Sequence, residues 1–63
     1  MKVKTFVKLI SVHDFDLIIV DHKNESIKFV DTLSSEQDIP EEYYDYKVHL
    51  YSDIESNTLY IRK

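Results

Sequence analysis

The chain contains no cysteine and no glycine, and each absence excludes a class of site. Without cysteine, neither a disulfide nor a zinc–thiolate centre can form. This points to a reducing compartment, although a chain without cysteine is also compatible with secretion. Without glycine, neither a GxGxxG fingerprint nor a P-loop can form, because both need glycine where the backbone approaches a phosphate. Any positive backbone φ must be taken by another residue at some cost, and we predict Asn24 and Asn57 for this role.

Long apolar runs are also missing, since no stretch approaches the roughly 18 residues that a membrane-spanning helix needs. The opening sequence MKVKTFVKLISVHDFD has the lysines and apolar residues of a secretion signal. Lys4 and Lys8 interrupt its apolar part, however, and no small-residue cleavage site follows. We therefore expect no membrane association and a cytoplasmic location.

The length of 63 residues predicts a single small domain over residues 1–63. A core of this size supplies only roughly 3–5 kcal/mol of net stability. Because no disulfide is available, self-association is the most accessible further source of stability. We therefore expect a homodimer.

Residues 2–11, KVKTFVKLIS, fit two kinds of secondary structure. At helical spacing, apolar residues from Val3 to Ile10 share one face and lysines lie opposite. The β-branched residues favour a strand instead, but Phe6 and Ile10 would then fall on the wrong face. We predict a short helix, with a strand as the alternative.

Two β-hairpins are predicted further along the chain. The run FDLIIVD (15–21) is nearly continuous in apolar character, which is typical of a strand covered on both faces. After the turn HKNE, SIKFVDT (26–32) returns as its partner. YKVHLYSD (46–53) alternates apolar and polar residues, and TLYIRK (58–63) follows it after a second turn.

The segment between the hairpins is predicted to contain a short helical turn. LSSEQD (33–38) has the composition of a polar connection, and IPEEYYDY (39–46) has room for one or two turns of helix. Pro40 fits the first helical position, which places Glu41 and Glu42 in the first turn, where the helix dipole favours carboxylates.

These elements predict an α+β fold in which the N-terminal helix packs on a four-stranded antiparallel sheet made of the two hairpins. We expect the sheet face under the helix to be formed by Leu17, Ile19, Ile27, Phe29, Val48, Leu50, Leu59 and Ile61. Tyr51 and Tyr60 are predicted to share the opposite face, together with Ile18, Val20 and His49. That face is either a sheet surface stabilised by aromatic pairs or an interface with a partner or a second copy.

The runs DFDLIIVD, SIKFVD and DIPEEYYDYKV resemble small acidic proteins that phages and mobile elements of low-GC Gram-positive bacteria encode. The resemblance spans most of the chain. Those relatives that have known roles are often inhibitors of host defence or host replication machinery. The resemblance therefore implies a host protein or protein complex as partner, in the cytoplasm of the host cell.

Charge is distributed unevenly along the chain, whose net charge is −4. Residues 1–10 sum to +3 and residues 11–46 to −8, and the stretch from Asp31 to Asp45 holds six acids and no base. A protein that binds nucleic acid directly would instead carry a basic stripe. We therefore predict no direct nucleic-acid binding.

The acidic stretch supplies the candidate partner-binding residues. We predict that Pro40–Asp45 forms a capped helical turn anchored to the sheet by its tyrosines. Its carboxylates are either only solvated, or they imitate a phosphate backbone and attract a basic groove on another protein. The candidate residues are Asp38, Glu41, Glu42, Tyr43, Tyr44 and Asp45, with Tyr51 and Tyr60 on the second sheet face.

No metal, cofactor or catalytic function is predicted. Histidines and acids cluster at His13–Asp16 and at Asp21–His22, but neighbours in a strand point to opposite faces and do not converge on one ion. The serines fall in turns and loops, and a single sheet of this size offers no deep cleft. We expect a non-enzymatic protein that acts by protein–protein contact, or alternatively a structural or accessory assembly protein.

Overall fold

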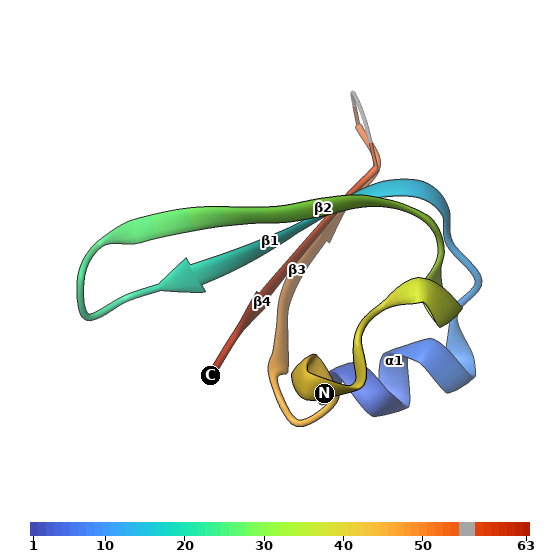
Figure 1. Ribbon diagram of the computed structural model, residues 1–63, viewed down its shortest axis with the longest axis horizontal. Helices are drawn as coiled ribbons and strands as arrows, with labels where there is room; N and C mark the ends of the chain where they lie inside the picture. Colours follow the sequence, from blue (N-terminus) through green and yellow to red (C-terminus); the bar gives the residue numbers. More distant parts are fainter. Residues whose placement is uncertain (55–56) are drawn as a thin grey trace.

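The computed structural model describes residues 1–54 and 57–63. The elements, in chain order, are α1 (Val3–Leu9), β1 (His13–Asp21), β2 (Ser26–Ser35), the 3-10 turns η1 (Glu36–Asp38) and η2 (Glu41–Tyr43), β3 (Lys47–Ser52) and β4 (Thr58–Arg62). The strands form one sheet, and α1 and the two 3-10 turns lie together on one side of it (Figure 1). The predicted α+β class, with an N-terminal helix and a four-stranded sheet, is confirmed.

The N-terminal segment is a helix, as predicted, and not the alternative strand. Val3 and Phe6 are buried on its inner face, while the lysines lie on its exposed face. The helix is shorter than predicted, because Ile10 already has an extended backbone and ends it. The spacing of the apolar residues thus outweighed the β-branched composition of the segment.

The first turn of α1 is held by a segment from the second half of the chain. Lys2 precedes the helix and offers no side-chain cap. The backbone N–H of Val3 donates to the carbonyl oxygen of Tyr46 at 2.8 Å. The next N–H, of Lys4, donates to the carbonyl oxygen of Tyr44 at 3.1 Å. Donors that a helix leaves without intrahelical partners are therefore satisfied by the tyrosine-rich segment.

The first predicted hairpin is present, and both of its strands are longer than predicted. β1 and β2 are antiparallel and pair from Asp21 and Ser26 at the turn to His13 and Ser35 at the far end. Residues 33–38 are therefore strand and 3-10 turn, and their prediction as a polar connection was wrong. Leu33 extends the strand because it lies opposite Phe15, and both side chains are buried.

The turn of this hairpin is organised by the carboxylate of Asp21. It accepts hydrogen bonds from the backbone N–H of Lys23 at 3.0 Å and from the side-chain amide of Asn24 at 2.7 Å. The residue with positive φ is Glu25 (φ 50°), so the prediction that Asn24 would take this position was wrong. The side chain of Asn24 holds the turn through Asp21 instead. The turn predicted around Asn57 includes residues 55–56, which lie outside the described residues.

The sheet is mixed, with the strand order β2-β1-β4-β3. β3 and β4 are antiparallel, but β4 lies parallel to β1 at the centre of the sheet. The prediction of a purely antiparallel sheet was therefore wrong at the junction of the two halves. β1 and β4 both supply buried side chains, and parallel pairs are favoured where the strands are covered.

The core lies between the sheet and the layer that contains α1. Its buried apolar residues are Val3, Phe6, Val12, Phe15, Leu17, Leu33, Ile39, Leu59 and Ile61. Among the predicted core residues of the sheet, Leu17, Leu59 and Ile61 are buried, and Ile19 and Val48 are partly buried against them. This part of the core prediction is confirmed.

Three residues predicted for the core are exposed. The exposed fractions are 68% for Ile27, 57% for Phe29 and 53% for Leu50. All three lie on strands at the edges of the sheet, β2 and β3. Their placement on the covered face was wrong.

The cause is one extra residue in each edge strand. In β2, Asp31 lies opposite Leu17 but Phe29 lies opposite Ile18, so Val30 is inserted between the two pairs. Val30 packs against the core, and the residues that precede it change face. Such a bulge reverses the alternation of side chains along the rest of the strand.

In β3 the extra residue is His49. Val48 lies opposite Ile61, but Leu50 lies opposite Tyr60 and Tyr51 lies opposite Leu59. Had the register of Val48 continued, Leu50 would pair with Leu59 on the core face. The bulge brings Tyr51 there instead.

Candidate functional site

The predicted partner-binding segment forms a single 3-10 turn, η2, between the two halves of the sheet. Pro40 precedes the first helical residue, so it lies one position earlier than predicted, while Glu41 and Glu42 are in the first turn as predicted. Ile39 is 2% exposed and fixes the start of the segment in the core. The turn is therefore attached to the folded domain at its beginning.

Tyrosines attach the other end of the segment. Tyr43, Tyr44 and Tyr46 are partly buried and pack against the core. The rings of Tyr43 and Tyr46 meet edge to face, with their centroids 5.1 Å apart. Burial raises the pKa of the Tyr43 phenol, and the nearby carboxylate of Glu42 raises it further. These side chains hold the segment in one position and leave its carboxylates at the surface.

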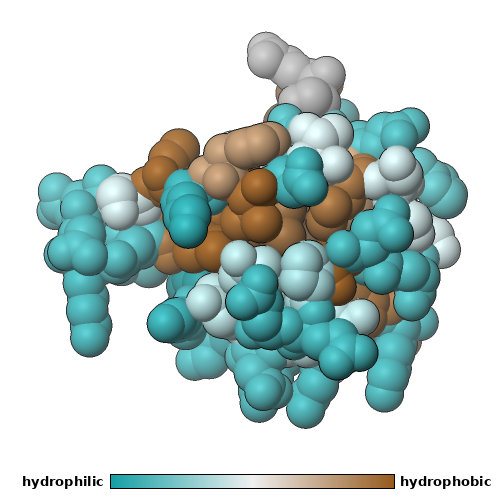
Figure 2. Space-filling model, viewed as in Figure 1, coloured by the Kyte–Doolittle hydropathy of each residue, from teal (hydrophilic) through white to brown (hydrophobic). Residues whose placement is uncertain are grey.

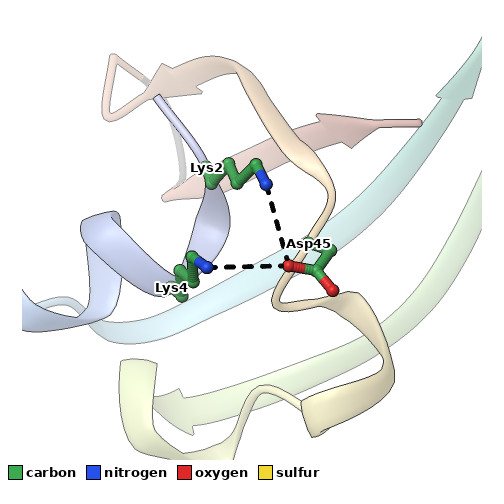
Figure 3. A network of polar contacts seen from close by, with 3 residues as sticks. All are labelled: Lys2, Lys4 and Asp45. Carbon is green, nitrogen blue, oxygen red and sulfur yellow. Dashed lines mark ion pairs between the residues drawn. The ribbon is translucent and has the colours of Figure 1, made fainter.

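One of the candidate acids has basic neighbours in space. The carboxylate of Asp45 lies 3.9 Å from Nζ of Lys2 and 3.8 Å from Nζ of Lys4 (Figure 3). All three side chains are at least half exposed, so these ion pairs contribute little to stability. They do reduce the negative charge at this end of the segment.

A second acid of the same stretch, Glu36, is structural. Its exposed fraction is 9%, and its carboxylate accepts hydrogen bonds from the backbone N–H of Val12 and the hydroxyl of Ser35, both at 3.1 Å. The hydrogen bond from Val12 is the main reason that the pKa of Glu36 lies below its ordinary value. Glu36 therefore links the chain before β1 to η1.

The other three candidate acids, Asp38, Glu41 and Glu42, are exposed, and we call them the acidic surface. They belong to η1 and η2, which lie on the α1 side of the sheet (Figure 1). Among the described residues, none of the three forms an ion pair. Their charges are thus available to a partner.

Tyr51 and Tyr60 lie on opposite faces of the sheet, and the prediction that they share one was wrong. Tyr51 packs against the core, with its ring centroid 5.9 Å from that of Phe6. Tyr60 lies opposite Leu50 on the other face. Leu59 and Tyr60 are adjacent in β4 and point to opposite faces. The bulge in β3 pairs Tyr51 with Leu59, which is buried. Tyr51 therefore packs against the core on the α1 side and is not part of the second sheet face.

The sheet face that α1 does not cover carries a row of apolar side chains, one from each strand. In strand order, the row is Phe29, Ile18, Tyr60 and Leu50. Ile27 and its partner Val20 follow on β2 and β1. We call these six residues the open face. Hydrophobic surface along the β1–β2 hairpin is visible in Figure 2.

The sequence placed part of the open face correctly, since it assigned Ile18, Val20 and Tyr60 to the second face. It missed Ile27, Phe29 and Leu50, because the two bulges that expose them leave no sign in the residue pattern. This face is therefore more apolar than predicted.

Histidines meet at the edge of this region. The ring centroids of His22 and His49 are 5.1 Å apart, and His22 also lines an open hollow of about 430 Å³ beside the ends of β1 and β4. Within residues 1–54 and 57–63, no three histidines or acids gather where they could hold a metal ion. The absence of a metal site stays a prediction, which rests on the opposite directions of neighbouring side chains in a strand.

Comparison with known proteins found no matching family model, no matching curated protein and no matching solved structure. None of the helices in the described part of the chain is both long and apolar enough to span a membrane.

Proposed function

We propose that this chain is a non-enzymatic protein-binding module that presents its acidic surface to a basic site on a partner. The observation that supports this most directly is the attachment of η2 at both ends, by Ile39 and by the half-buried ring of Tyr43. An acidic segment held in this way loses little conformational entropy when it binds. Charges that only served solubility would need no such attachment.

In its most specific form, the proposal is that the partner is a nucleic-acid-handling or defence complex of a bacterial host, which the chain inhibits. A row of exposed carboxylates can occupy a basic groove that otherwise binds a phosphate backbone. The resemblance to phage-encoded acidic proteins supports this form. Asp38, Glu41 and Glu42 would provide the long-range attraction, and the exposed edges of Tyr43 and Tyr44 would provide contact area.

The test compares two charge-reversed baits with the original chain. Glu41→Lys with Glu42→Lys removes the acidic surface, and Asp31→Lys with Asp53→Lys makes the same change in net charge elsewhere on exposed residues. Each tagged chain is used to capture proteins from a Gram-positive lysate at low and moderate salt. The captured protein is then assayed for nucleic-acid binding with and without the chain.

The proposal predicts a nucleic-acid-binding partner that the original and the Asp31/Asp53 variant retain and the Glu41/Glu42 variant loses. Moderate salt should weaken capture, because exposed charges are screened over about 8–10 Å. The chain should also compete with nucleic acid for that partner. Equal capture by both variants, or a partner whose nucleic-acid binding is unaffected, would contradict it.

An assembly protein is the second candidate, and the open face is the observation that favours it. Apolar patches on small proteins commonly mark interaction sites. In this case reversal at Glu41 and Glu42 leaves function intact, while a charge placed at Phe29 abolishes it.

A further inference from the structure

The open face has an apolar centre formed by side chains that the fold itself leaves uncovered. Phe29 and Leu50 lie at the two ends of the row, on the edge strands, and both are more than half exposed. Ile18 and Tyr60 join them across the two central strands and are themselves half-buried. A continuous apolar row with an aromatic residue is the composition of an interface centre.

Charged residues lie beyond this centre and differ in sign at its two ends. Asp16 is two residues before Ile18 in β1 and accepts a hydrogen bond at 2.7 Å from the hydroxyl of Thr32 in β2. Arg62 is two residues after Tyr60 in β4 and pairs in register with Lys47 of β3. Since residues two apart in a strand share a face, the open face has one acidic and one basic end.

We propose that two copies of this chain form a homodimer by packing their open faces together. A two-fold axis that runs along the apolar row, across the strands, places the row against its own copy. The same axis reverses the strand direction, so Asp16 of one copy approaches the basic end, with Arg62 of the partner subunit. The interface is isologous and closed, so the contact between Asp16 and Arg62 of the partner subunit occurs twice in the dimer.

The order of charges favours a second copy over another kind of partner. A face with a single sign of charge would repel its own copy, whereas this face is complementary to itself after a two-fold rotation. The acidic surface does not take part, because η1 and η2 lie on the α1 side of the sheet. The dimer would therefore carry two acidic surfaces, both free to bind.

The β1–β2 hairpin gives a further reason for the dimer. β1 pairs with β4 only as far as Ile19, so residues 20–27 form a two-stranded arm that extends away from α1 (Figure 1). An isolated two-stranded hairpin is marginally stable in water. The proposed axis places this arm opposite the Asp16 end of the second copy, which would cover Val20 and Ile27.

Sedimentation equilibrium of the original chain, from low micromolar to millimolar concentration, tests the proposal. We expect a monomer–dimer equilibrium. Phe29→Lys and, independently, Leu50→Lys should each raise the dissociation constant by at least about tenfold, because each places a charge in the apolar row that packs against its own copy. Because both residues are more than half exposed, neither change should unfold the monomer, which circular dichroism checks.

Leu9→Lys is the matched control, since Leu9 is 70% exposed on α1, away from the open face. It should leave the dissociation constant unchanged. A dimer that Phe29→Lys and Leu50→Lys leave intact would overturn the proposal. A chain that stays monomeric at every concentration would also overturn it. If that monomer binds a hydrophobic dye through the open face, a different partner is indicated.

Charge exchange tests the geometry of the axis. Asp16→Lys alone and Arg62→Glu alone should each weaken the dimer, because each places like charges opposite one another. The double variant restores opposite charges at both contacts and should return the dissociation constant to within about threefold of the original, given usual non-additivity. A double variant as weak as the worse single variant would overturn this arrangement.

Discussion

The carboxylate of Glu36 accepts a hydrogen bond at 3.1 Å from the backbone N–H of Val12, although the two residues are 24 positions apart. Val12 is buried between α1 and β1, where its N–H has no strand partner. A buried donor without an acceptor is costly, and water cannot easily replace the missing partner there. One acid of the acidic stretch therefore stabilises the fold and is not part of any binding surface.

Glu36→Gln is expected to destabilise the chain. The amide keeps one oxygen acceptor, but it loses the charge that strengthens the hydrogen bonds from Val12 and Ser35. The midpoint of urea unfolding should fall, and Glu36→Ala should lower it further. Glu41→Gln is the control, because Glu41 is exposed and its midpoint should not change measurably. Equal effects at positions 36 and 41 would contradict the structural role of Glu36.

Stability should also depend on pH in the acid range. Hydrogen bonds lower the pKa of Glu36 in the folded chain, and hydrogen bonds from Asn24 lower that of Asp21. Between the lowered pKa and the ordinary pKa, each of these carboxyl groups binds more protons in the unfolded chain than in the folded chain. Their contribution to the free energy of unfolding is therefore full above about pH 5, and it is lost as the pH falls through the pKa values of the folded chain.

Urea unfolding measured from neutral pH down to about pH 2 tests this expectation, since carboxyl groups titrate in that range. The free energy of unfolding should be flat at the upper end and fall below about pH 5. In Glu36→Gln and Asp21→Asn the fall should be shallower, because one titrating group has been removed from each. A fall of the same steepness in both variants would assign the pH dependence to other groups.

The features that local sequence determines were predictable. The helix follows from the spacing of Val3 and Phe6, and the first hairpin follows from the apolar run that ends at Asp21 and the turn after it. Each depends on residues only a few positions apart, so periodicity and turn composition are sufficient.

The features that failed depend on pairing between distant strands. An extra residue at His49 does not disturb the alternation in YKVHLYSD, so the bulge is not visible in the sequence. The parallel pairing of β1 with β4 is likewise set by how the two halves pack. Within the candidate site, Glu36 was indistinguishable from Glu41 as a sequence position, because the partner of its carboxylate lies on another segment.

Two leucines that the sequence assigned to the same face should respond very differently to truncation. Leu59 is fully buried, so Leu59→Ala should lower the free energy of unfolding by about 2–5 kcal/mol, which is most of the stability of a domain this small. Leu50 is 53% exposed, and Leu50→Ala should cost less than about 0.5 kcal/mol in the monomer. Urea unfolding at low micromolar concentration compares them, and equal losses would place Leu50 in the core.

Deletion of His49 tests the bulge in β3 directly. The remaining residues already have regular partners, with Val48 opposite Ile61 and Leu50 opposite Tyr60, so removal of the extra residue keeps every side chain on its present face. We expect the shortened chain to fold with a free energy of unfolding within about 1 kcal/mol of the original, as for other changes at exposed positions.

Deletion of Tyr60 is the control, because it removes one residue from a strand without a bulge. Ile61 would then follow Leu59 directly and point to the open face, and the core would lose a fully buried side chain. This variant should be unfolded by circular dichroism. If deletion of His49 unfolds the chain as completely, the prediction is wrong. The extra residue would then be required for the pairing of β3 with β4.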